Sequence, residues 1–597
     1  MKGTCQKKAG AFFVLQRNLK MSIAYAIELR SPEAHLFRVT LTLTKPMPDE
    51  QLLMLPTWIP GSYMIRDMAG DIVEAKAYLN DMPAELSKID KTTWRVATGS
   101  AQSTLKIVYD VFAKDLSVRL AYFDMHRAFF NPTSLCLCPI GLESEPMTIE
   151  VLPGESALTQ KWHVATALKP QNAKKRWKYG VFEAKDYDEL ADSPFEVSDF
   201  DVLSFRVGGA DHHIVLSGTR LPFDEKRLLR DVKANCEATI ELFEPKLKKA
   251  PFNDYVFLLN LDDHLYGGLE HRASTALIAS YYDLPQKTTT KDDVGYQHLL
   301  GLFTHEYFHA WWVKRVKPAA FVPYDYHDEN YTRLLWVFEG FTSYYDDLLL
   351  LKTESITQEA YCSGIAKVLN RHLWAAGRLH QSLSESSFDA WTKYYKTMVN
   401  RQNSVTSYYD KGALVALALD SHIRAKSKGE KSLDDVLRLA WEQYKEVGSD
   451  YAGLDEDAMA ELIYDATGIA VDAELACWVD ACEEPDWKKA FAQLGIKVTK
   501  TDTEPLTALG LAVSGNEQLM VRTVIEQSPA QQAGLSEGDW LVALSGIHVT
   551  KANLEKLIKV YVGQTVSVHV IRNERLIELK LKIEKPTKDT LSLAFKD

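Results

Sequence analysis

The first third of the chain alternates apolar and polar positions. The alternation is clearest at residues 37–43 and recurs at 105–111 and, more briefly, at 147–151. A period of two residues is typical of a β-strand with one buried face. Turn-forming dipeptides such as Pro60-Gly61 separate the stretches. The pattern therefore predicts an antiparallel β domain over residues 21–210.

The middle of the chain has helical spacing instead. Apolar residues recur every three or four positions, most clearly at 292–317, 333–352 and 409–425. This spacing predicts an α-rich domain over residues 211–425, followed by a helical extension over 426–497.

The end of the chain returns to strand patterning. A polar, aperiodic stretch over residues 497–505 is expected to be a linker. Beyond it, residues 566–570 and 577–583 alternate around a turn at Asn573-Glu574, which predicts a β-hairpin. We expect a separate small β domain over 498–597, so the whole chain belongs to the multidomain α+β class.

Composition narrows the range of functions. The chain has 597 residues, of which 46% are hydrophobic and 25% charged, a mix typical of globular proteins. A net charge of −12 argues against nucleic-acid partners, which need a basic surface. No apolar run reaches the roughly 18 residues needed to cross a bilayer, so no membrane span is expected.

The N-terminus and the cysteines bear on location. Residues 1–20 contain four lysines and only a short apolar stretch before a second Met at position 21, so we interpret them as an extension. Seven cysteines in so long a chain favour a reducing compartment. We expect a cytoplasmic protein; the alternative is the periplasm, if the extension acts as an export signal.

One helical stretch carries a metal-binding pattern, H-E-x-x-H. His305 and His309 are four residues apart, which places both imidazoles on one helix face, where they can bind one zinc ion. Glu306 lies beside them and can take a proton from a water whose pKa zinc lowers to about 7. The pattern predicts Glu306 as general base; the alternative is two helix histidines with ordinary hydrogen bonds.

A third ligand is expected downstream. Glu339 is a single acid within an apolar, aromatic helix, and a buried carboxylate needs a cation or a proton. Zinc would supply the cation, although pairing with Arg333 is an alternative. Asp346 lies two turns later on the same face, where it either orients a ligating histidine or is simply solvated.

Three segments together resemble the glycyl aminopeptidase family of zinc metallopeptidases. They read HEYFHAWWVKR at 305–315, LWVFEGFT at 335–342 and WIPGSY at 58–63. The resemblance implies a thermolysin-like catalytic domain, one zinc ion per chain and cleavage of the N-terminal peptide bond, with preference for Gly and Ala. It also implies an inserted loop at about residues 318–331, beside the cleft.

Two further motifs acquire roles from this resemblance. GGLEH at 267–271 is similar to the motif in which a glycine backbone lies along the substrate and an acid grips its α-amine, which implies substrate binding by Gly267, Gly268 and Glu270. Pairing of Glu270 with Arg272 is the alternative. YYDKG at 408–412 resembles the stretch whose tyrosine stabilises the oxyanion; Tyr409 fits the spacing and Tyr408 competes with it.

The C-terminal domain resembles a bacterial PDZ domain through SPAQQAGLSEGD at 528–539. TALGLA at 507–512 would then be the loop that binds a peptide C-terminus, with Leu509, Gly510 and Leu511 at its centre. The alternative is a domain that only packs beside the cleft.

These features together predict a zinc-dependent aminopeptidase that acts on peptides. Two alternatives are open: a zinc endopeptidase of the same fold, and a non-catalytic PDZ scaffold on a degenerate peptidase.

Overall fold

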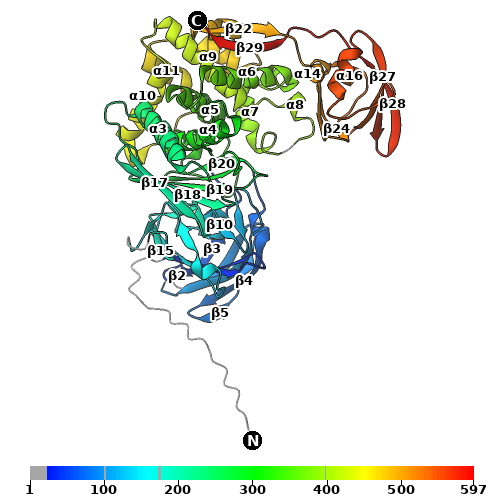
Figure 1. Cartoon of the computed structure of the whole chain (residues 1–597). Helices are drawn as coiled ribbons and strands as arrows, with labels where there is room; N and C mark the ends of the chain where they lie inside the picture. The colour runs from blue at the N-terminus through cyan, green and yellow to red at the C-terminus, as the bar shows by residue number, and fades with distance from the viewer. Residues whose placement is uncertain (1–22, 100–101, 173–175, 397, 597) are drawn as a thin grey trace.

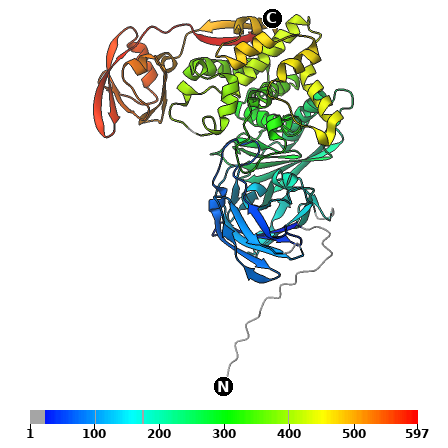
Figure 2. The same cartoon turned by 180° about the vertical axis from the view of Figure 1, so that it is seen from behind.

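The computed structural model describes residues 23–596, except 100–101, 173–175 and 397. The predicted extension 1–20 and the alternative start at Met21 lie outside this part of the chain. A β domain occupies one end of the molecule, a helical body the other, and a small β domain lies at the side of the helical body (Figures 1 and 2).

The N-terminal domain is built on an eight-stranded sheet. Its central strand β2 alternates buried and half-buried residues along Leu36–Leu43, as the sequence pattern predicts. All neighbours in the sheet are antiparallel except β1 and β12, which pair in parallel. In sheet order the strands are β14 (Lys169–Pro170), β15 (Gly180–Ala184), β12 (Met147–Leu152), β1 (Ile23–Ser31), β2, β8 (Leu105–Phe112), β4 (Ile72–Leu79) and β5 (Met82–Ala84).

Two four-stranded sheets complete this domain and share its hydrophobic core. Two short helices, α1 (Pro132–Leu135) and α2 (Tyr187–Ala191), connect the strands. One sheet consists of β13 (His163–Ala165), β16 (Phe195–Ser198), β10 (Arg127–Phe130) and β9 (Ala121–Phe123), and the other of β11 (Cys138–Pro139), β3 (Glu50–Met54), β7 (Thr93–Ala97) and β6 (Ser87–Lys88).

A five-stranded sheet joins the N-terminal domain to the helical body (Figure 1). One face contributes Tyr255 and Phe257 to the core of the helical body, and the other packs Val256 and Leu258 against residues of the N-terminal domain. The sheet begins at Asp201, inside the range 21–210. In order its strands are β17 (Asp201–Val207), β18 (Ala210–Gly218), β19 (Asp254–Leu261), β21 (Ser274–Ala279) and β20 (Gly267–Glu270).

Helices cover the face of this sheet that points away from the N-terminal domain. The long helices are α3 (Glu225–Phe243), α4 (Val294–Phe308), α5 (Leu335–Lys352), α6 (Gln358–Trp374), α9 (Asp410–Lys426) and α10 (Leu433–Val447). Shorter ones are α7 (Leu383–Phe388), α8 (Arg401–Ser404), α11 (Met459–Thr467), α12 (Asp472–Leu475) and α13 (Trp487–Gln493). No helix in the described residues is long and apolar enough to cross a membrane.

The helical prediction for 292–317 is too long. Helix α4 ends at Phe308, and the chain then turns so sharply that Val313 adopts a φ of +94°. Trp311 and Trp312 are both fully buried there. Their burial on all sides extends the apolar pattern past the true end of the helix, which explains the error.

Helices α5 and α9 touch backbone to backbone. A Cβ atom added to Gly340 would lie 2.5 Å from the Cα atom of Gly412, and one added to Gly412 would lie 2.8 Å from the Cα atom of Gly340. No residue larger than glycine fits at this crossing without displacing a helix. The crossing brings Glu339, next to Gly340, close to the beginning of α9.

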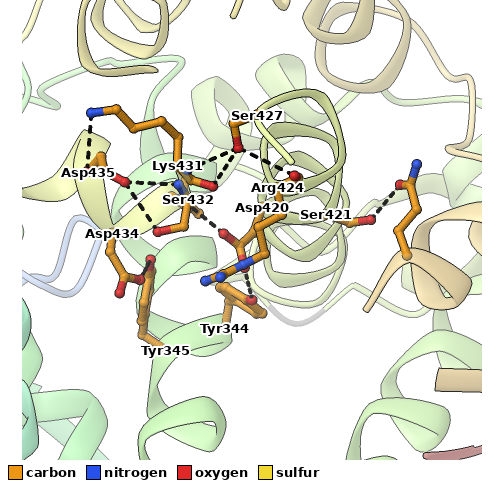
Figure 3. A network of polar contacts seen from close by, with 12 residues as sticks. Tyr344, Tyr345, Asp420, Ser421, Arg424, Ser427, Lys431, Ser432, Asp434 and Asp435 are labelled. Carbon is orange, nitrogen blue, oxygen red and sulfur yellow. Dashed lines mark hydrogen bonds and ion pairs between the residues drawn. The ribbon is translucent and has the colours of Figure 1, made fainter. Parts of the chain in front are cut away.

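A polar network holds the same helices together (Figure 3). The carboxylate of Asp420 on α9 accepts hydrogen bonds from the Tyr344 hydroxyl on α5 and from Nε of Arg424, each at 2.8 Å. The Tyr345 hydroxyl on α5 donates to Asp434 on α10 at 2.8 Å. Because the partners are buried or half-buried, the network fixes α5 relative to α9 and α10.

The C-terminal β domain has its own core. Its hairpin β27–β28 turns at Asn573-Glu574, both with positive φ, as the sequence predicts. In order the strands are β23 (Leu511–Ser514), β24 (Leu519–Val524), β25 (Trp540–Leu544), β27 (Thr565–Arg572) and β28 (Arg575–Lys582), with β26 (Ile547–His548) beside β25; the helices are α14 (Pro505–Leu509), α15 (Pro529–Gln532) and α16 (Leu554–Val560).

The predicted linker 497–505 is wrong over its first half. Strand β22 (Ile496–Thr501) pairs with β29 (Thr590–Phe595), and the pair packs on α6. Only Ile496 and Val498 of β22 turn toward the helical core, while the other four residues are exposed. So polar a strand gives little apolar signal in the sequence.

Candidate active site

His305 and His309 occupy the C-terminal end of α4, and their Nε2 atoms lie 3.1 Å apart. The Nδ1 atom of His305 lies 2.9 Å from a carboxylate oxygen of Asp346, and that of His309 lies 2.9 Å from the carbonyl oxygen of Trp312. Since both partners are acceptors, each Nδ1 carries the proton and donates. Both Nε2 lone pairs are therefore free and converge on one point.

Glu339 reaches the same point from α5. Its Oε2 atom lies 3.3 Å from Nε2 of His309 and 3.7 Å from Nε2 of His305, and the side chain is 2% exposed. The alternative partner Arg333 binds Glu456 and Asp457 instead. Burial raises the pKa of Glu339, whereas positive charge on His309 and His305 outweighs burial and lowers the pKa to about 2, so the carboxylate needs a positive charge at this point.

The three side chains fit a metal ion. Their ligand atoms all lie within 4.8 Å of one another, and two nitrogen lone pairs face a carboxylate oxygen in a buried space. Such groups repel unless a cation lies between them. Two imidazoles and one carboxylate are a donor set that catalytic zinc uses, with a fourth position left open.

Glu306 lies beside this cluster and packs against the backbone of β20. A Cβ atom on Gly268 would lie 2.1 Å from its Oε1 atom, so any larger residue there would displace the carboxylate. Its Oε2 atom is buried and has no hydrogen-bond partner among the described residues. Burial raises the pKa of Glu306 to about 7, although the nearby His305 opposes this. A pKa near neutrality suits a general base.

Glu270 ends the edge strand β20, on which Gly267 and Gly268 also lie. Glu270 forms a second group with Glu306 and His309, whose ligand atoms lie within 4.8 Å of one another. Burial raises the pKa of Glu270, and its Oε1 atom has no partner in the part of the chain that is described. The alternative partner Arg272 directs its guanidinium to the hydroxyl of Tyr444, at 3.2 Å.

The N-terminal domain also approaches the carboxylate of Glu270. Gly61, within the WIPGSY segment, has a φ of +98°, and a Cβ atom on it would lie 2.5 Å from both carboxylate oxygens of Glu270. The same segment binds the loop at 318–331: the indole Nε1 of Trp58 donates to the carbonyl of Asp325 at 2.7 Å. The WIPGSY motif is recognisable as a family feature, but nothing in its sequence indicates a contact with Glu270.

Tyr409 and Tyr408, the two candidates for stabilising the oxyanion, have different surroundings. The ring of Tyr409 is 6.4 Å from the ring of His305, and its hydroxyl lies 3.2 Å from the hydroxyl of Tyr395. Tyr395 itself donates to the carbonyl of Gly61 at 3.1 Å, so the proton between the two hydroxyls comes from Tyr409, whose hydroxyl is a donor in this geometry. Tyr408 is fully buried, with its ring 4.5 Å from that of Tyr394. This geometry favours Tyr409.

A buried charge pair lies behind Glu270 and was not predicted. Asp192, at the end of α2, accepts from Nζ of Lys314 at 2.6 Å and from the backbone N–H of Arg272 at 2.8 Å, and its Oδ1 atom lies 3.2 Å from Nδ1 of His271. These contacts fix His271 and Arg272, the two residues that follow Glu270. No local pattern around Asp192 distinguishes it from a solvated acid.

In the C-terminal domain, Leu509 and Leu511 are buried on either side of Gly510, which has a φ of +66°. The N–H group of Gly510 donates to the carbonyl of Thr507 at 3.0 Å, and its carbonyl accepts from Ile525 at 2.8 Å. Strand β23, which follows, is the edge of its sheet.

Comparisons with known proteins match three parts of the chain. Residues 24–199 match the peptidase M61 N-terminal domain, residues 298–415 the M61 glycyl aminopeptidase and residues 492–583 a PDZ domain. The crystal structure of an aminopeptidase N family protein from Idiomarina loihiensis is 34% identical to the chain, with a TM-score of 0.91, over 96% of this chain and 98% of that one. This chain belongs to the M61 glycyl aminopeptidase family.

Two more distant matches are each 14% identical to the chain, with a TM-score of 0.47 over 78% of its length. One is M1 zinc metallopeptidase from Deinococcus radiodurans, of which 94% is covered. The other is yeast LTA4 hydrolase in complex with bestatin, of which 68% is covered. A search of curated proteins gives no match. As a member of the M61 family, the chain is a zinc metallopeptidase, which argues against the alternative of a non-catalytic scaffold.

Proposed function

We propose that this M61 peptidase removes small N-terminal residues, Gly and Ala, from peptides, using one zinc ion held by His305, His309 and Glu339. The observation that carries the proposal is Glu270: a buried carboxylate without a described partner for Oε1, beside the metal cluster. An endopeptidase has no use for an unpaired acid at this position. An aminopeptidase needs one, because its substrate carries a free ammonium group.

The zinc ion supplies Lewis acidity, which lowers the pKa of water and polarises the scissile carbonyl group. Glu306 accepts the proton of the attacking water and then delivers it to the leaving amine. Its buried, unpartnered Oε2 atom makes this transfer feasible. Asp346 and the carbonyl of Trp312 orient the two imidazoles through their Nδ1 protons.

The edge strand β20 and the N-terminal domain bind the substrate. Glu270 binds the ammonium group, while Gly267 and Gly268 let the substrate backbone approach β20. Tyr409 donates its hydroxyl proton to the oxygen that becomes negative in the transition state. The preference for small residues is supported by crowding at Glu270, where Gly61 contacts the carboxylate and Tyr395 closes over Gly61.

The C-terminal domain offers a binding edge for a peptide C-terminus. Strand β23 is the edge strand of its sheet in the described residues, so an added strand can pair with it, and the turn at Gly510 precedes it. Leu509 and Leu511 hold that turn in place from the core of the domain.

The proposal is tested by hydrolysis of Ala, Gly, Leu and Phe p-nitroanilides and of their N-acetylated forms. We expect hydrolysis of the free Ala and Gly substrates, little of Leu or Phe, and none of the acetylated forms. An unchanged rate on acetylated substrates would show an endopeptidase. One zinc atom per chain is the expected metal content.

A further inference from the structure

A cavity of about 290 Å³ lies outside the residues assigned above. It lies where the end of α6, the segment 401–407 and the beginning of α9 meet, and its polar lining includes Arg371, Arg378, Tyr394, Arg401, Ser407 and Asp410. Nothing in the proposed reaction uses these residues. The volume is sufficient for a small ligand.

The lining carries more positive than negative charge. Arg371 makes two hydrogen bonds of 2.7 Å with Asp410, so these two charges cancel. Arg401 has no carboxylate partner within the described residues, and its guanidinium lies 4.2 Å from the ring centre of Tyr394. Arg378 has only a distant carboxylate partner, because its Nη1 atom lies 4.0 Å from Oε1 of Glu484. Two guanidinium groups are therefore available to an anion, in a chain whose net charge is −12.

A further cation lies next to the cavity. Lys411 follows Asp410 on α9 and is fully buried, yet its Nζ atom has no hydrogen-bond partner in the described part of the chain. A buried ammonium group without a partner is costly. The carboxylate of Glu484 acts on this ammonium group, and its Oε2 atom likewise has no hydrogen-bond partner in this part of the chain, so Lys411 is balanced by Glu484 and the charge of the cavity rests on Arg401 and Arg378.

The cavity shares a wall with the active site. The hydroxyl of Tyr394 lies 3.1 Å from the Ser407 hydroxyl, and its ring centre is 4.5 Å from that of Tyr408 and 5.6 Å from that of Tyr409. Asp410 follows Tyr409 directly in the chain. The rings of Tyr394 and Tyr409 therefore connect the cavity to the ring of His305, which lies 6.4 Å from that of Tyr409.

The other side of the segment 401–407 contacts the PDZ domain. Asn403 donates to the carbonyl of Val524 at 2.9 Å and accepts from the N–H group of Glu526 at 2.9 Å. Trp374, at the end of α6, donates to the carbonyl of Thr507 at 3.2 Å. The segment is thus held between the PDZ domain and the cavity, and it leads directly to Tyr409.

We propose that this cavity binds a small oxyanion, a carboxylate or a phosphate, through Arg401 and Arg378, and that the bound anion fixes the segment that positions Tyr409. Two sources supply this chemistry: the C-terminal carboxylate of a short peptide substrate, or a free anion such as inorganic phosphate. The first source rests on the proposed function, whereas the second does not.

The first experiment measures binding without activity. Inorganic phosphate is titrated by calorimetry into the full-length zinc-loaded protein at constant ionic strength. We expect one saturable site and an affinity at least about tenfold weaker in Arg401→Gln, the loss typical of one charged hydrogen bond. Arg227→Gln is the matched control, because Arg227 also lies over a tyrosine ring, that of Tyr296, at 5.0 Å.

Absence of saturable binding, or equal affinity in Arg401→Gln and Arg227→Gln, would overturn the proposal. Arg378→Gln gives a second, independent variant if Arg401→Gln folds poorly, as judged by its melting curve. Because no turnover is measured, failure here is distinct from failure of the proposed peptidase activity.

The second experiment identifies the source by comparing kcat/KM for tri-alanine with that for its C-terminal amide. If the substrate carboxylate occupies the cavity, the acid is preferred, Arg401→Gln removes the preference and phosphate competes with substrate. If the occupant is a free anion, acid and amide react equally and phosphate changes kcat without competing. Rates that are equal for acid and amide and unaffected by phosphate would exclude any action on Tyr409.

Discussion

Gly61→Ala tests whether the N-terminal domain forms part of the amine site. The added methyl would lie 2.5 Å from both carboxylate oxygens of Glu270, whereas ordinary contact begins at 3.4 Å, so the carboxylate must retreat by about 0.9 Å (3.4 minus 2.5 Å). Moving it from about 4 to about 5 Å from a substrate ammonium loses about 0.8 kcal/mol at an effective dielectric constant of about 20.

Loss of the charged hydrogen bond adds about 1.5–3 kcal/mol. Together these effects lower kcat/KM by about 50- to 600-fold. The assay is hydrolysis of Ala p-nitroanilide by protein with full zinc content. We expect metal content and the far-ultraviolet circular dichroism spectrum to remain those of the wild type.

The control is Gly99→Ala. Gly99 also has a positive φ, +65°, but a Cβ atom on it would meet nothing within 4 Å. It therefore also places alanine at a positive φ, but without the contact. If folded Gly61→Ala keeps kcat/KM within threefold of Gly99→Ala, then Gly61 does not constrain the amine site and the reasoning is wrong.

Three further predictions address other groups. Glu306→Gln should retain zinc by atomic absorption yet lower kcat by about 10²–10⁴-fold, because the amide accepts no proton; substantial turnover would move the base elsewhere. Tyr409→Phe should lower kcat by about 10²–10³-fold and Tyr408→Phe only slightly; the reverse order would reassign the oxyanion donor. Burial raises the pKa of Asp192, but Lys314 and His271 outweigh it and hold that pKa well below its ordinary value, so its stabilisation is present above about pH 4 and lost as pH falls further. Asp192→Asn should reduce the free energy of unfolding at pH 7 by about 3–5 kcal/mol in urea denaturation, and a loss that persists undiminished at pH 3 would contradict this account.

Local patterns in the sequence predicted the centre of the site better than its surroundings. His305 and His309 are close because four residues make one helical turn, and Glu339 was distinguished by its apolar neighbours. These signals are local, so a single sequence contains them. The structure brings all three together.

The contacts around Glu270 depend on packing between domains. Gly61 of the N-terminal domain lies against its carboxylate, and Asp192 of the same domain binds the backbone of Arg272. Tyr395, from a segment without helical or strand pattern, binds the carbonyl of Gly61. Periodicity describes which face of an element is buried but not what covers that face. The end of α4 was misplaced for a related reason: residues buried on every side carry no periodic signal.

The pairing of β22 with β29 has a consequence for the PDZ domain. The polypeptide leaves the helical body through β22 and returns to it through β29, so the domain is an insertion tethered at two adjacent points. Truncation of the chain after the last strand of the PDZ domain would leave that domain in place. It would instead remove β29, so that β22 loses its paired strand and α6 is exposed to solvent. Removal of the PDZ domain alone requires deletion of the segment between β22 and β29 and its replacement by a short linker.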